Sequence, residues 1–265
     1  MATIDPWPSA AELDAAYGGP YRPDAGRFGG IGDALLRRTR GALAGRLEQI
    51  APPGPILDVG AGEGALGRAL RARGREVVES ERPVATAAAA ADVPEAPAGG
   101  WAAIVFWHSL EHLTEPAASL ERAAGALASR GVMVIAVPNS DSLQAKLFGE
   151  RWLALDPPRH LVHLTARALR RRLESLGLAV ERVSYLRGGQ IFFGWLDGLV
   201  GATPGHPSLY DAVRRPAARF QPISPGRRLA TLALAGLLAP VALLGSAVEV
   251  AARRGGTVYV EARAR

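Results

Sequence analysis

The sequence contains no cysteine, and only one of its 31 basic residues, Lys146, is a lysine. Without cysteine there is no disulfide framework, no thiolate metal site and no cysteine nucleophile. The arginines are scattered from Arg22 to Arg265, so the net charge of +6 does not form the clustered basic patch that nucleic-acid binding requires. We therefore expect no nucleic-acid partner.

The N-terminus also lacks a basic stretch followed by an apolar run, which would mark a secretory signal peptide. We accordingly expect a cytoplasmic protein. Long apolar runs are scarce, and only residues 229–248 form a stretch of about twenty residues without a charge. With 48% hydrophobic residues among 265, the chain can bury the core of a large α/β domain.

Segments with strand and helix patterns alternate from residue 55 onward, and Gly74, Gly131 and Gly177 mark helix ends. This alternation predicts a mostly parallel sheet with helices on both faces. Residues 1–30, rich in Gly, Pro, Tyr and Asp, predict an irregular arm or lid. The predicted strands are 55–60, 75–80, 102–107, 132–137, 179–186 and 257–262, and the predicted helices are 32–50, 64–73, 84–91, 115–129 and 165–176.

We divide the chain into an N-terminal arm and helix (1–50), a cofactor-binding domain (51–187 with 256–265) and an apolar helical insertion (188–255). The uncharged run 229–248 in the insertion allows three interpretations: a buried or domain-covering helix kinked at its proline, an interfacial or re-entrant membrane contact, and a hairpin that spans a bilayer. A single crossing is excluded if the strands on either side share one sheet. A membrane contact would place the protein at the inner membrane surface.

A glycine-rich turn follows the first predicted strand, with glycines at 60, 62 and 64. Such a loop brings backbone N–H groups and a helix N-terminus against a ligand, and it is found in several classes of nucleotide-cofactor site. Asp58 and Glu63 would repel the pyrophosphate of a nicotinamide cofactor, whereas S-adenosylmethionine carries an ammonium and a sulfonium group. These acids favour S-adenosylmethionine, with Asp58, Gly60, Gly62 and Gly64 as binding residues.

An acid about twenty residues beyond such a loop is expected to bind the ribose hydroxyls of the cofactor. Glu79 and Glu81 both follow the second predicted strand at about this distance. We choose Glu81 because it lies close to the following turn, whereas Glu79 could equally be a solvated charge at the strand end.

Two histidines and a carboxylate are clustered after the strand 102–107, at His108, Glu111 and His112. If a helix begins at Ser109, the two histidines are four residues apart and could share a face with metal-ligand spacing. The alternative is structural, with His112 bonded to backbone beneath the cofactor and Glu111 capping a helix. We predict no metal ion, and we place His108 and Glu111 at the cofactor.

The segment 151–163 follows the next strand and should face the same pocket, because ligands collect at the carboxyl ends of parallel strands. It contains His160 and His163. A neutral histidine near the transferred methyl group could accept the proton of a hydroxyl or amine acceptor. We therefore name His160, His163 and His112 as catalytic candidates; the alternative is that His160 and His163 only order the loop.

Taken together, these motifs resemble the class I S-adenosylmethionine-dependent methyltransferases, especially the bacterial group with a Leu-Glu-His turn after the fourth strand. The resemblance covers about residues 40–187. It implies a seven-stranded Rossmann-like sheet with an antiparallel last strand, here 257–262, and it implies that the apolar run is an insertion. It also implies that the glycine loop binds the methionine part of the cofactor and that Asp92 lies beside the adenine. The matching segments are 56–62, 107–112, 131–139 and 157–161 with His163.

Quinone-ring O-methyltransferases of the same superfamily look similar at Glu111 and His112, but they have another acid where this chain has His108. This difference argues against their divalent-cation site and against a quinone acceptor. The resemblance therefore implies methyl transfer to an acceptor that the sequence does not identify, and the apolar insertion favours a hydrophobic or lipid-linked one. A second hypothesis is a non-catalytic scaffold that binds S-adenosylmethionine as a partner subunit, and a third is a nicotinamide oxidoreductase.

Overall fold

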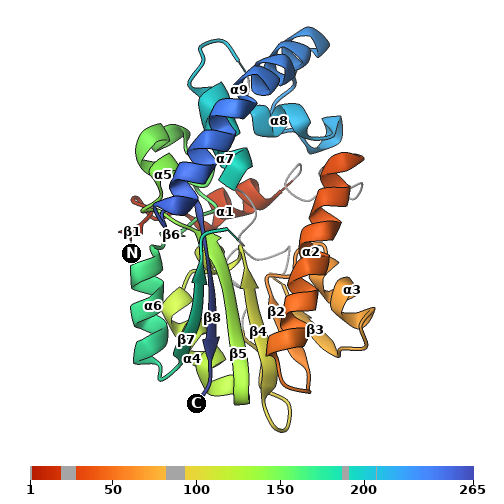
Figure 1. Ribbon diagram of the computed structural model, residues 1–265, viewed down its shortest axis with the longest axis vertical. Helices are drawn as coiled ribbons and strands as arrows, with labels where there is room; N and C mark the ends of the chain where they lie inside the picture. Colours follow the sequence, from red (N-terminus) through yellow and green to blue (C-terminus); the bar gives the residue numbers. More distant parts are fainter. Residues whose placement is uncertain (1, 19–27, 82–92, 187–190, 207) are drawn as a thin grey trace.

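The protein is described by a computed structural model that covers residues 2–18, 28–81, 93–186, 191–206 and 208–265. Within these residues a central sheet has six strands in the order β3-β2-β4-β5-β8-β7 (Figure 1). Residues 82–92, between β3 and β4, lie outside the described ranges, and so does the helix predicted at 84–91. The strands are β2 (Ile56–Val59), β3 (Val77–Ser80), β4 (Trp101–Trp107), β5 (Leu127–Pro138), β7 (Ala179–Ser184) and β8 (Thr257–Arg263).

Strands β2 to β5 are parallel, and β8 is antiparallel to both of its neighbours, β5 and β7. This confirms the mostly parallel α/β sheet with an antiparallel last strand. In register, Val59 lies opposite Ser80 on one side and Phe106 on the other. The carboxyl ends of β2, β3 and β4 therefore meet at one edge of the sheet, where ligands bind in folds of this class.

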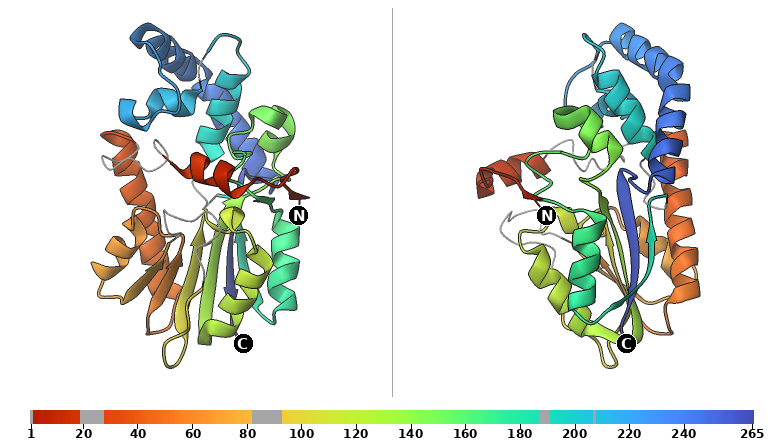
Figure 2. Two further views of the ribbon diagram at one scale, coloured as in Figure 1. Left: turned by 180° about the vertical axis from the view of Figure 1, so that it is seen from behind. Right: turned by 60° about the vertical axis from the view of Figure 1, so that its left-hand side comes forward.

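Helices cover both faces of the sheet, as predicted (Figure 2). Successive strand residues point to opposite faces, so Ile56 packs toward one layer of helices and Leu57 toward the other. The first layer is α2 (Ile31–Ile50) with α3 (Ala65–Arg71), and the second is α4 (Pro116–Ala126) with α6 (Ala166–Ser175).

The N-terminal arm contains a helix, and the prediction that it is irregular was wrong there. Helix α1 (Ala10–Tyr17) begins at a capping box, in which the Ser9 hydroxyl accepts from the Glu12 N–H and the Glu12 carboxylate accepts from the Ser9 N–H. The Ser-x-x-Glu spacing of Ser9 and Glu12 indicates a helix start, but the prediction relied on the composition of the segment instead. Strand β1 (Ala2–Thr3) pairs with β6 (Val162–His163), which fixes the arm against the segment 151–163.

The fourth helix is shorter than predicted: α4 ends at Ala126, and β5 begins at Leu127 instead of residue 132. Leu127 pairs with Trp101, the first residue of β4. Gly100 makes this pairing feasible, because a Cβ there would lie 2.6 Å from the Ala128 nitrogen. The strand therefore includes residues 127–129, which were predicted to be helical.

Beyond the carboxyl ends of the strands lie α5 (Leu143–Phe148) and the helices of the insertion, α7 (Ile191–Gly201), α8 (Leu209–Val213) and α9 (Pro225–Ala251) (Figure 1). Among the described residues, α9 is the one helix long and apolar enough to cross a membrane, by length and composition. Only 17% of its most apolar window is buried. The first interpretation of residues 229–248 was a buried or domain-covering helix, and this exposure disagrees with the buried form only.

Candidate active site

The glycine loop connects β2 directly to α3, as the sequence predicted. Gly60, Gly62 and Gly64 have φ values of 76°, 61° and 66°, in the left-handed region that residues with a side chain rarely adopt. A Cβ on Gly60 would lie 2.4 Å from the Cβ of Ser109. Position 60 therefore requires glycine both for the turn and for the close approach of the segment that follows β4.

Glu81 lies beside this loop, because its carboxylate accepts a hydrogen bond from the Gly62 N–H. The preceding residue also contacts the loop, since the Gly60 N–H donates to the Ser80 carbonyl at 2.7 Å. Glu79, the other acid considered for the ribose, instead forms an ion pair with Arg71 at 2.9 Å. Asp92, predicted for the adenine side, lies outside the described residues.

Asp58 is buried beneath the loop, with 2% of its surface exposed. Burial raises the pKa of this carboxyl to about 7; the charge of Arg40 on α2 acts in the opposite direction, and those of Glu79 and Glu81 raise it further. Arg40 itself stacks over the Trp107 ring, with 5.1 Å between its Cζ and the ring centroid. Asp58 is thus a buried acid whose charge changes near neutral pH.

The turn after β4 is held against the ends of two other strands. The His108 N–H donates to the Ala136 carbonyl of β5 at 2.8 Å, and the Ser109 hydroxyl donates to the Val59 carbonyl of β2 at 2.5 Å. His108 has a left-handed backbone, with φ of 53°, and the helix that follows is a single 3₁₀ turn, Leu110–His112. The helix that would place His108 and His112 on one face therefore does not form.

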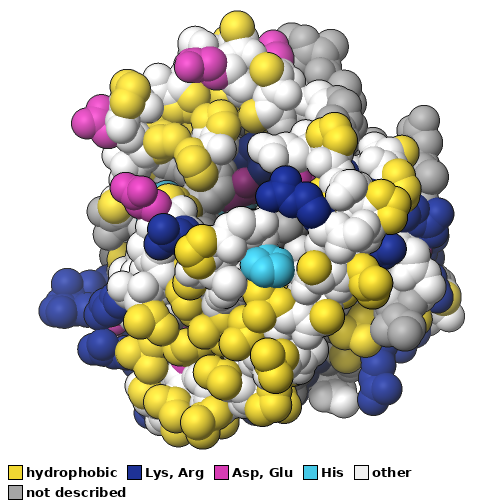
Figure 3. All heavy atoms as spheres, turned by 90° about the horizontal axis from the view of Figure 1, so that it is seen from above, with side chains coloured by type: hydrophobic (Ala, Val, Ile, Leu, Met, Phe, Trp, Pro, Cys, Tyr) yellow, Lys and Arg dark blue, Asp and Glu magenta, His cyan; other side chains and the backbone are white. Residues whose placement is uncertain are grey.

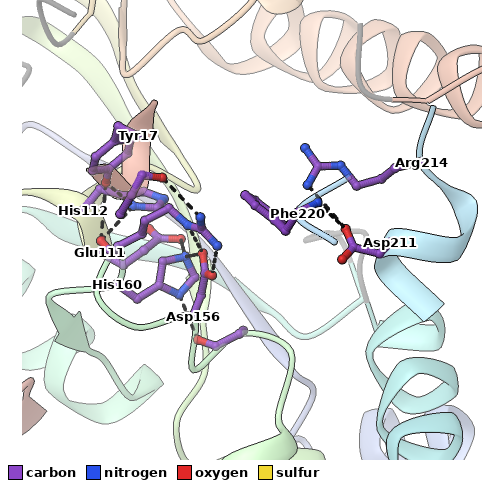
Figure 4. Close-up of polar contacts among 11 residues, drawn as sticks. Tyr17, Glu111, His112, Asp156, His160, Asp211, Arg214 and Phe220 are labelled. Atoms are coloured by element: carbon purple, nitrogen blue, oxygen red, sulfur yellow. Dashed lines mark hydrogen bonds and ion pairs between the residues drawn. The ribbon is translucent and has the colours of Figure 1, made fainter. Parts of the chain in front are cut away.

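Five polar side chains from three segments meet above this turn (Figure 4). Glu111 and His112 come from the 3₁₀ turn, Asp156 and His160 from the loop after α5, and Tyr17 from the end of α1. The His112 and His160 rings are 4.6 Å apart between centroids. The Nε2 of His160 lies 4.0 Å from Glu111 Oε1 and 3.8 Å from Asp156 Oδ2. We call these five residues the Glu–His cluster.

Backbone carbonyls orient both imidazoles of the cluster. His160 Nδ1 lies 2.8 Å from the Ala154 carbonyl, and His112 Nδ1 lies 3.0 Å from the Arg159 carbonyl and 2.9 Å from Tyr17 Oη. A carbonyl oxygen can only accept a hydrogen bond, so Nδ1 carries the hydrogen in each ring. In a neutral ring, Nε2 then keeps its lone pair.

Glu111 is a buried carboxylate, and neither of its oxygens has a hydrogen-bond partner among the described residues. Burial raises its pKa, but His108, whose Nδ1 lies 3.6 Å away, and the charges of His112 and His160 outweigh burial and lower the pKa to about 2. Burial lowers the pKa of His112 to about 4. At neutral pH the cluster therefore combines an ionised Glu111 with a neutral His112.

Glu111, His112 and His160 could also hold a metal ion, because one ligand atom from each lies within 4.8 Å of the others. The sequence pointed instead to His108 as the partner of His112. His160 takes that place because its loop is anchored to the 3₁₀ turn by the hydrogen bond from the Leu161 N–H to the Glu111 carbonyl, 2.8 Å long. That no metal is needed stays a prediction.

His163, the third catalytic candidate, lies in β6 at the edge of this group. Its ring faces Trp152, with 6.3 Å between centroids. Burial lowers its pKa, and the charge of His160 lowers it further while that of Glu111 raises it. His163 therefore interacts electrostatically with the cluster but is not one of its five side chains.

Phe220 of the insertion lies across from the cluster (Figure 4) and contacts Arg159, which belongs to the same loop as Asp156 and His160. The Arg159 guanidinium stacks over the Phe220 ring at 4.8 Å on the cluster side, and the buried Arg214 stacks over it at 4.5 Å. The Phe220 N–H donates to Asp211 Oδ1 at 3.0 Å. Sequence reasoning did not find Phe220 or Tyr17, because neither belongs to a motif. The N-terminal segment was expected to form an irregular arm or lid, but none of its residues was named for the site.

A parallel α/β sheet with a glycine loop at the carboxyl end of its first core strand defines a Rossmann-like cofactor-binding protein. Residues 33–183 match the sequence model of a family described as a methyltransferase domain. The match covers more than half of the chain, which therefore belongs to the methyltransferase-domain family. A comparison with curated proteins gives no significant match.

Solved structures with a similar fold include the [4+2]-cyclase SpnF, which is 16% identical, with 100% of this chain and 99% of that chain covered and a TM-score of 0.48. A SAM-dependent methyltransferase from Archaeoglobus fulgidus is 14% identical, with 88% of this chain and 100% of that chain covered and a TM-score of 0.46. These likenesses concern the fold alone.

Proposed function

We propose that this protein is an enzyme that transfers a methyl group from S-adenosylmethionine to an oxygen, nitrogen or carbon atom of a hydrophobic or lipid-linked acceptor. One observation carries the proposal: the glycine loop and the Glu–His cluster converge at the same edge of the sheet. The Ser109 hydroxyl, bonded to the Val59 carbonyl at 2.5 Å, joins the turn that bears the cluster to the strand that bears the loop.

The residues of the loop fit S-adenosylmethionine. Gly60 is packed against Ser109, but a Cβ at Gly62 would meet none of the described residues within 4 Å, which suits a ligand on the outer side of the loop. Glu81 adds a carboxylate at this point, which suits ribose hydroxyls and a cationic ligand. When bound there, the cofactor supplies an electrophilic methyl group on its sulfonium.

The cluster supplies a proton acceptor. Nδ1 of His160 is engaged by the Ala154 carbonyl, which leaves Nε2 to take the proton of an acceptor hydroxyl or amine. The carboxylate of Glu111, 4.0 Å from that nitrogen, would stabilise the resulting imidazolium. His112 packs edge-on against the same ring and is the alternative base, whereas His163 orders the loop.

The acceptor would lie between the cluster and the insertion. The insertion presents Phe220 toward the cluster and Tyr210 behind it, on the other side of the Arg214 guanidinium. An aromatic lining of this kind suits an apolar acceptor, and it excludes water from the transfer. Methyl transfer itself requires mainly that the acceptor atom is held in line with the methyl group.

The cofactor part of the proposal predicts that Glu81→Gln weakens S-adenosylmethionine binding about tenfold or more, because a charge-assisted hydrogen bond contributes ~1.5–3 kcal/mol. The matched control is Glu79→Gln, the same substitution two residues away in an acid that binds Arg71 instead. Isothermal titration calorimetry with S-adenosylmethionine and S-adenosylhomocysteine measures both variants. Equal affinities in the two variants would remove Glu81 from the site, and a wild-type protein that binds neither compound would contradict the proposed function.

A further inference from the structure

Helix α9 bears a row of exposed apolar side chains on one face. Leu237, Val241, Leu244 and Val248 follow one another at intervals of four, three and four residues, a spacing that aligns them along one side of a helix. Between 50% and 76% of the surface of each is exposed. We call these four residues the α9 stripe. The buried residues of α9, which include Thr231, Ala235, Ala242 and Glu249, lie on another side of the helix.

Arginines stand at both ends of this helix. Arg227 and Arg228 lie in its first turn, Arg253 and Arg254 directly follow it, and all four are exposed. A helix of 27 residues is about 40 Å long at ~1.5 Å per residue. Along α9, the surface is therefore positively charged at both ends and apolar between them. An apolar face bordered by arginines matches the anionic headgroups and the acyl layer of a membrane surface.

We propose that the α9 stripe docks onto a membrane leaflet that contains anionic lipid, with the helix lying in the plane of the interface. A crossing helix does not fit the topology, because the insertion leaves the sheet at β7 and returns at β8, which are neighbours in that sheet. Both ends of the insertion therefore lie on the same side of any bilayer. The 11 residues of α7 are too few for a return pass.

A second copy of this chain is a poorer occupant of the stripe. If two α9 helices paired antiparallel, Arg227 and Arg228 of each copy would meet Arg253 and Arg254 of the other. If they paired parallel, each arginine pair would meet the same pair of the other copy. Either arrangement places like charges together at both ends of the contact, whereas anionic headgroups would neutralise them.

Other apolar surfaces lie near the stripe. Seen from above, apolar side chains gather along one edge of the molecule, over the insertion (Figure 3). Helix α2 lies on the same side of the molecule as α9 (Figures 1 and 2), and its residues Leu35 to Arg38 are exposed. At the C-terminal end of α9 an open apolar groove of about 560 Å³ lies between Leu186, Phe192 and Val250. An acyl chain fits a groove of this lining.

This docking would present a lipid-linked acceptor to the insertion that borders the Glu–His cluster, and in that respect the inference rests on the proposed function. Membrane binding itself requires neither cofactor nor catalysis. A test can therefore show methyl transfer without membrane binding, or membrane binding without methyl transfer.

The test is co-sedimentation of the full chain with vesicles of phosphatidylcholine and phosphatidylglycerol, compared with phosphatidylcholine alone. We expect binding that needs the anionic lipid and that weakens at high salt. The double variant Leu237→Glu/Leu244→Glu should lower the vesicle partition coefficient about tenfold or more, because it places two charges on the face that enters the acyl layer. Both side chains are exposed, so the variant should fold.

The matched control is Leu147→Glu, the same substitution at a leucine of similar exposure, 64% against 67% for Leu244. Leu147 belongs to α5, which contacts α9 through its buried residue Glu249 and not through the stripe. The control should bind vesicles as wild type does. A wild-type protein that stays in the supernatant, or equal loss in both variants, would overturn the proposal. So would light scattering that shows a dimer dissociated by the stripe variant without any vesicle binding.

Discussion

Asp58, which the sequence predicts to bind the cofactor, is a buried acid whose ionisation affects stability. Its carboxyl is 2% exposed, and burial raises its pKa from 3.8 to about 7. The folded-state pKa exceeds the unfolded one, so folding favours the protonated form. The stability that Asp58 contributes is fully present below about pH 4 and is lost as the pH rises through 7.

Replacing Asp58 by Asn should therefore stabilise the protein at pH 8 and leave it little changed at pH 4. The difference in unfolding free energy at pH 8 should be ~2–4 kcal/mol, from ~1.4 kcal/mol per pKa unit. Urea unfolding at several pH values measures it, with the exposed Asp14→Asn as control. Parallel pH profiles for wild type and Asp58→Asn would show that the buried carboxyl does not titrate as described.

Much of the site was predictable because its residues follow strands in a fixed order. The glycine loop, Glu81 and the histidines of the two later loops follow successive parallel strands, and the carboxyl ends of such strands share one edge. Tyr17 and Phe220 could not be predicted in this way. Tyr17 reaches His112 across 95 positions of sequence through the packing of the N-terminal arm, and Phe220 comes from the insertion. The pairing of His160 with His112 is supported by hydrogen bonds between their segments, from the Leu161 N–H to the Glu111 carbonyl and from His112 Nδ1 to the Arg159 carbonyl, which no local pattern encodes.

The helices of the insertion are joined to the domain by a buried carboxylate. Glu249 of α9 is fully buried; its Oε1 accepts from the Gln144 N–H at 2.9 Å, and its Oε2 accepts from Gln144 Nε2 at 2.8 Å and Trp195 Nε1 at 2.9 Å. These bonds connect α9 to α5 and α7. All three groups that face Glu249 are donors.

Glu249→Gln should therefore lower the free energy of unfolding by ~1–3 kcal/mol, because an amide has one acceptor oxygen and leaves at least one buried donor unsatisfied. Urea unfolding is the measurement, and Glu76→Gln, at an exposed acid, is the control. An unchanged midpoint for Glu249→Gln would mean that α9 is held by apolar packing alone.

The sequence predicted the helices less accurately than it predicted the sheet. The alternation of strands and helices was sufficient to predict a mostly parallel sheet with helices on both faces, but it did not give the order of the strands. The end of α4 was placed wrongly because Gly100 allows β5 to begin at Leu127, a tertiary contact that overrides helix propensity. For α9, the sequence showed twenty uncharged residues but not which of them pack on α7 and which remain exposed.

Three parts of the molecule cooperate in this account. The sheet holds the glycine loop and the turn that bears Glu111 and His112, the N-terminal arm contacts that turn through Tyr17, and Phe220 of the insertion contacts Arg159 in the neighbouring loop. The apolar surface of the insertion faces outward on α9. The protein is thus a methyltransferase-domain chain in which Glu111 and His160 are buried and the apolar surface of α9 is exposed, an arrangement that suits the proposed delivery of an acceptor from a membrane.

The most direct test of the central claim is transfer of a radiolabelled methyl group from S-adenosylmethionine to bacterial membrane lipids. We predict label in the organic extract with wild-type protein. His160→Asn should lower the rate about a hundredfold or more with unchanged cofactor affinity, since the amide can still donate to the Ala154 carbonyl but cannot take the proton. Protein that binds S-adenosylmethionine yet transfers no label to lipid or soluble acceptors would contradict the account and indicate a cofactor-binding scaffold.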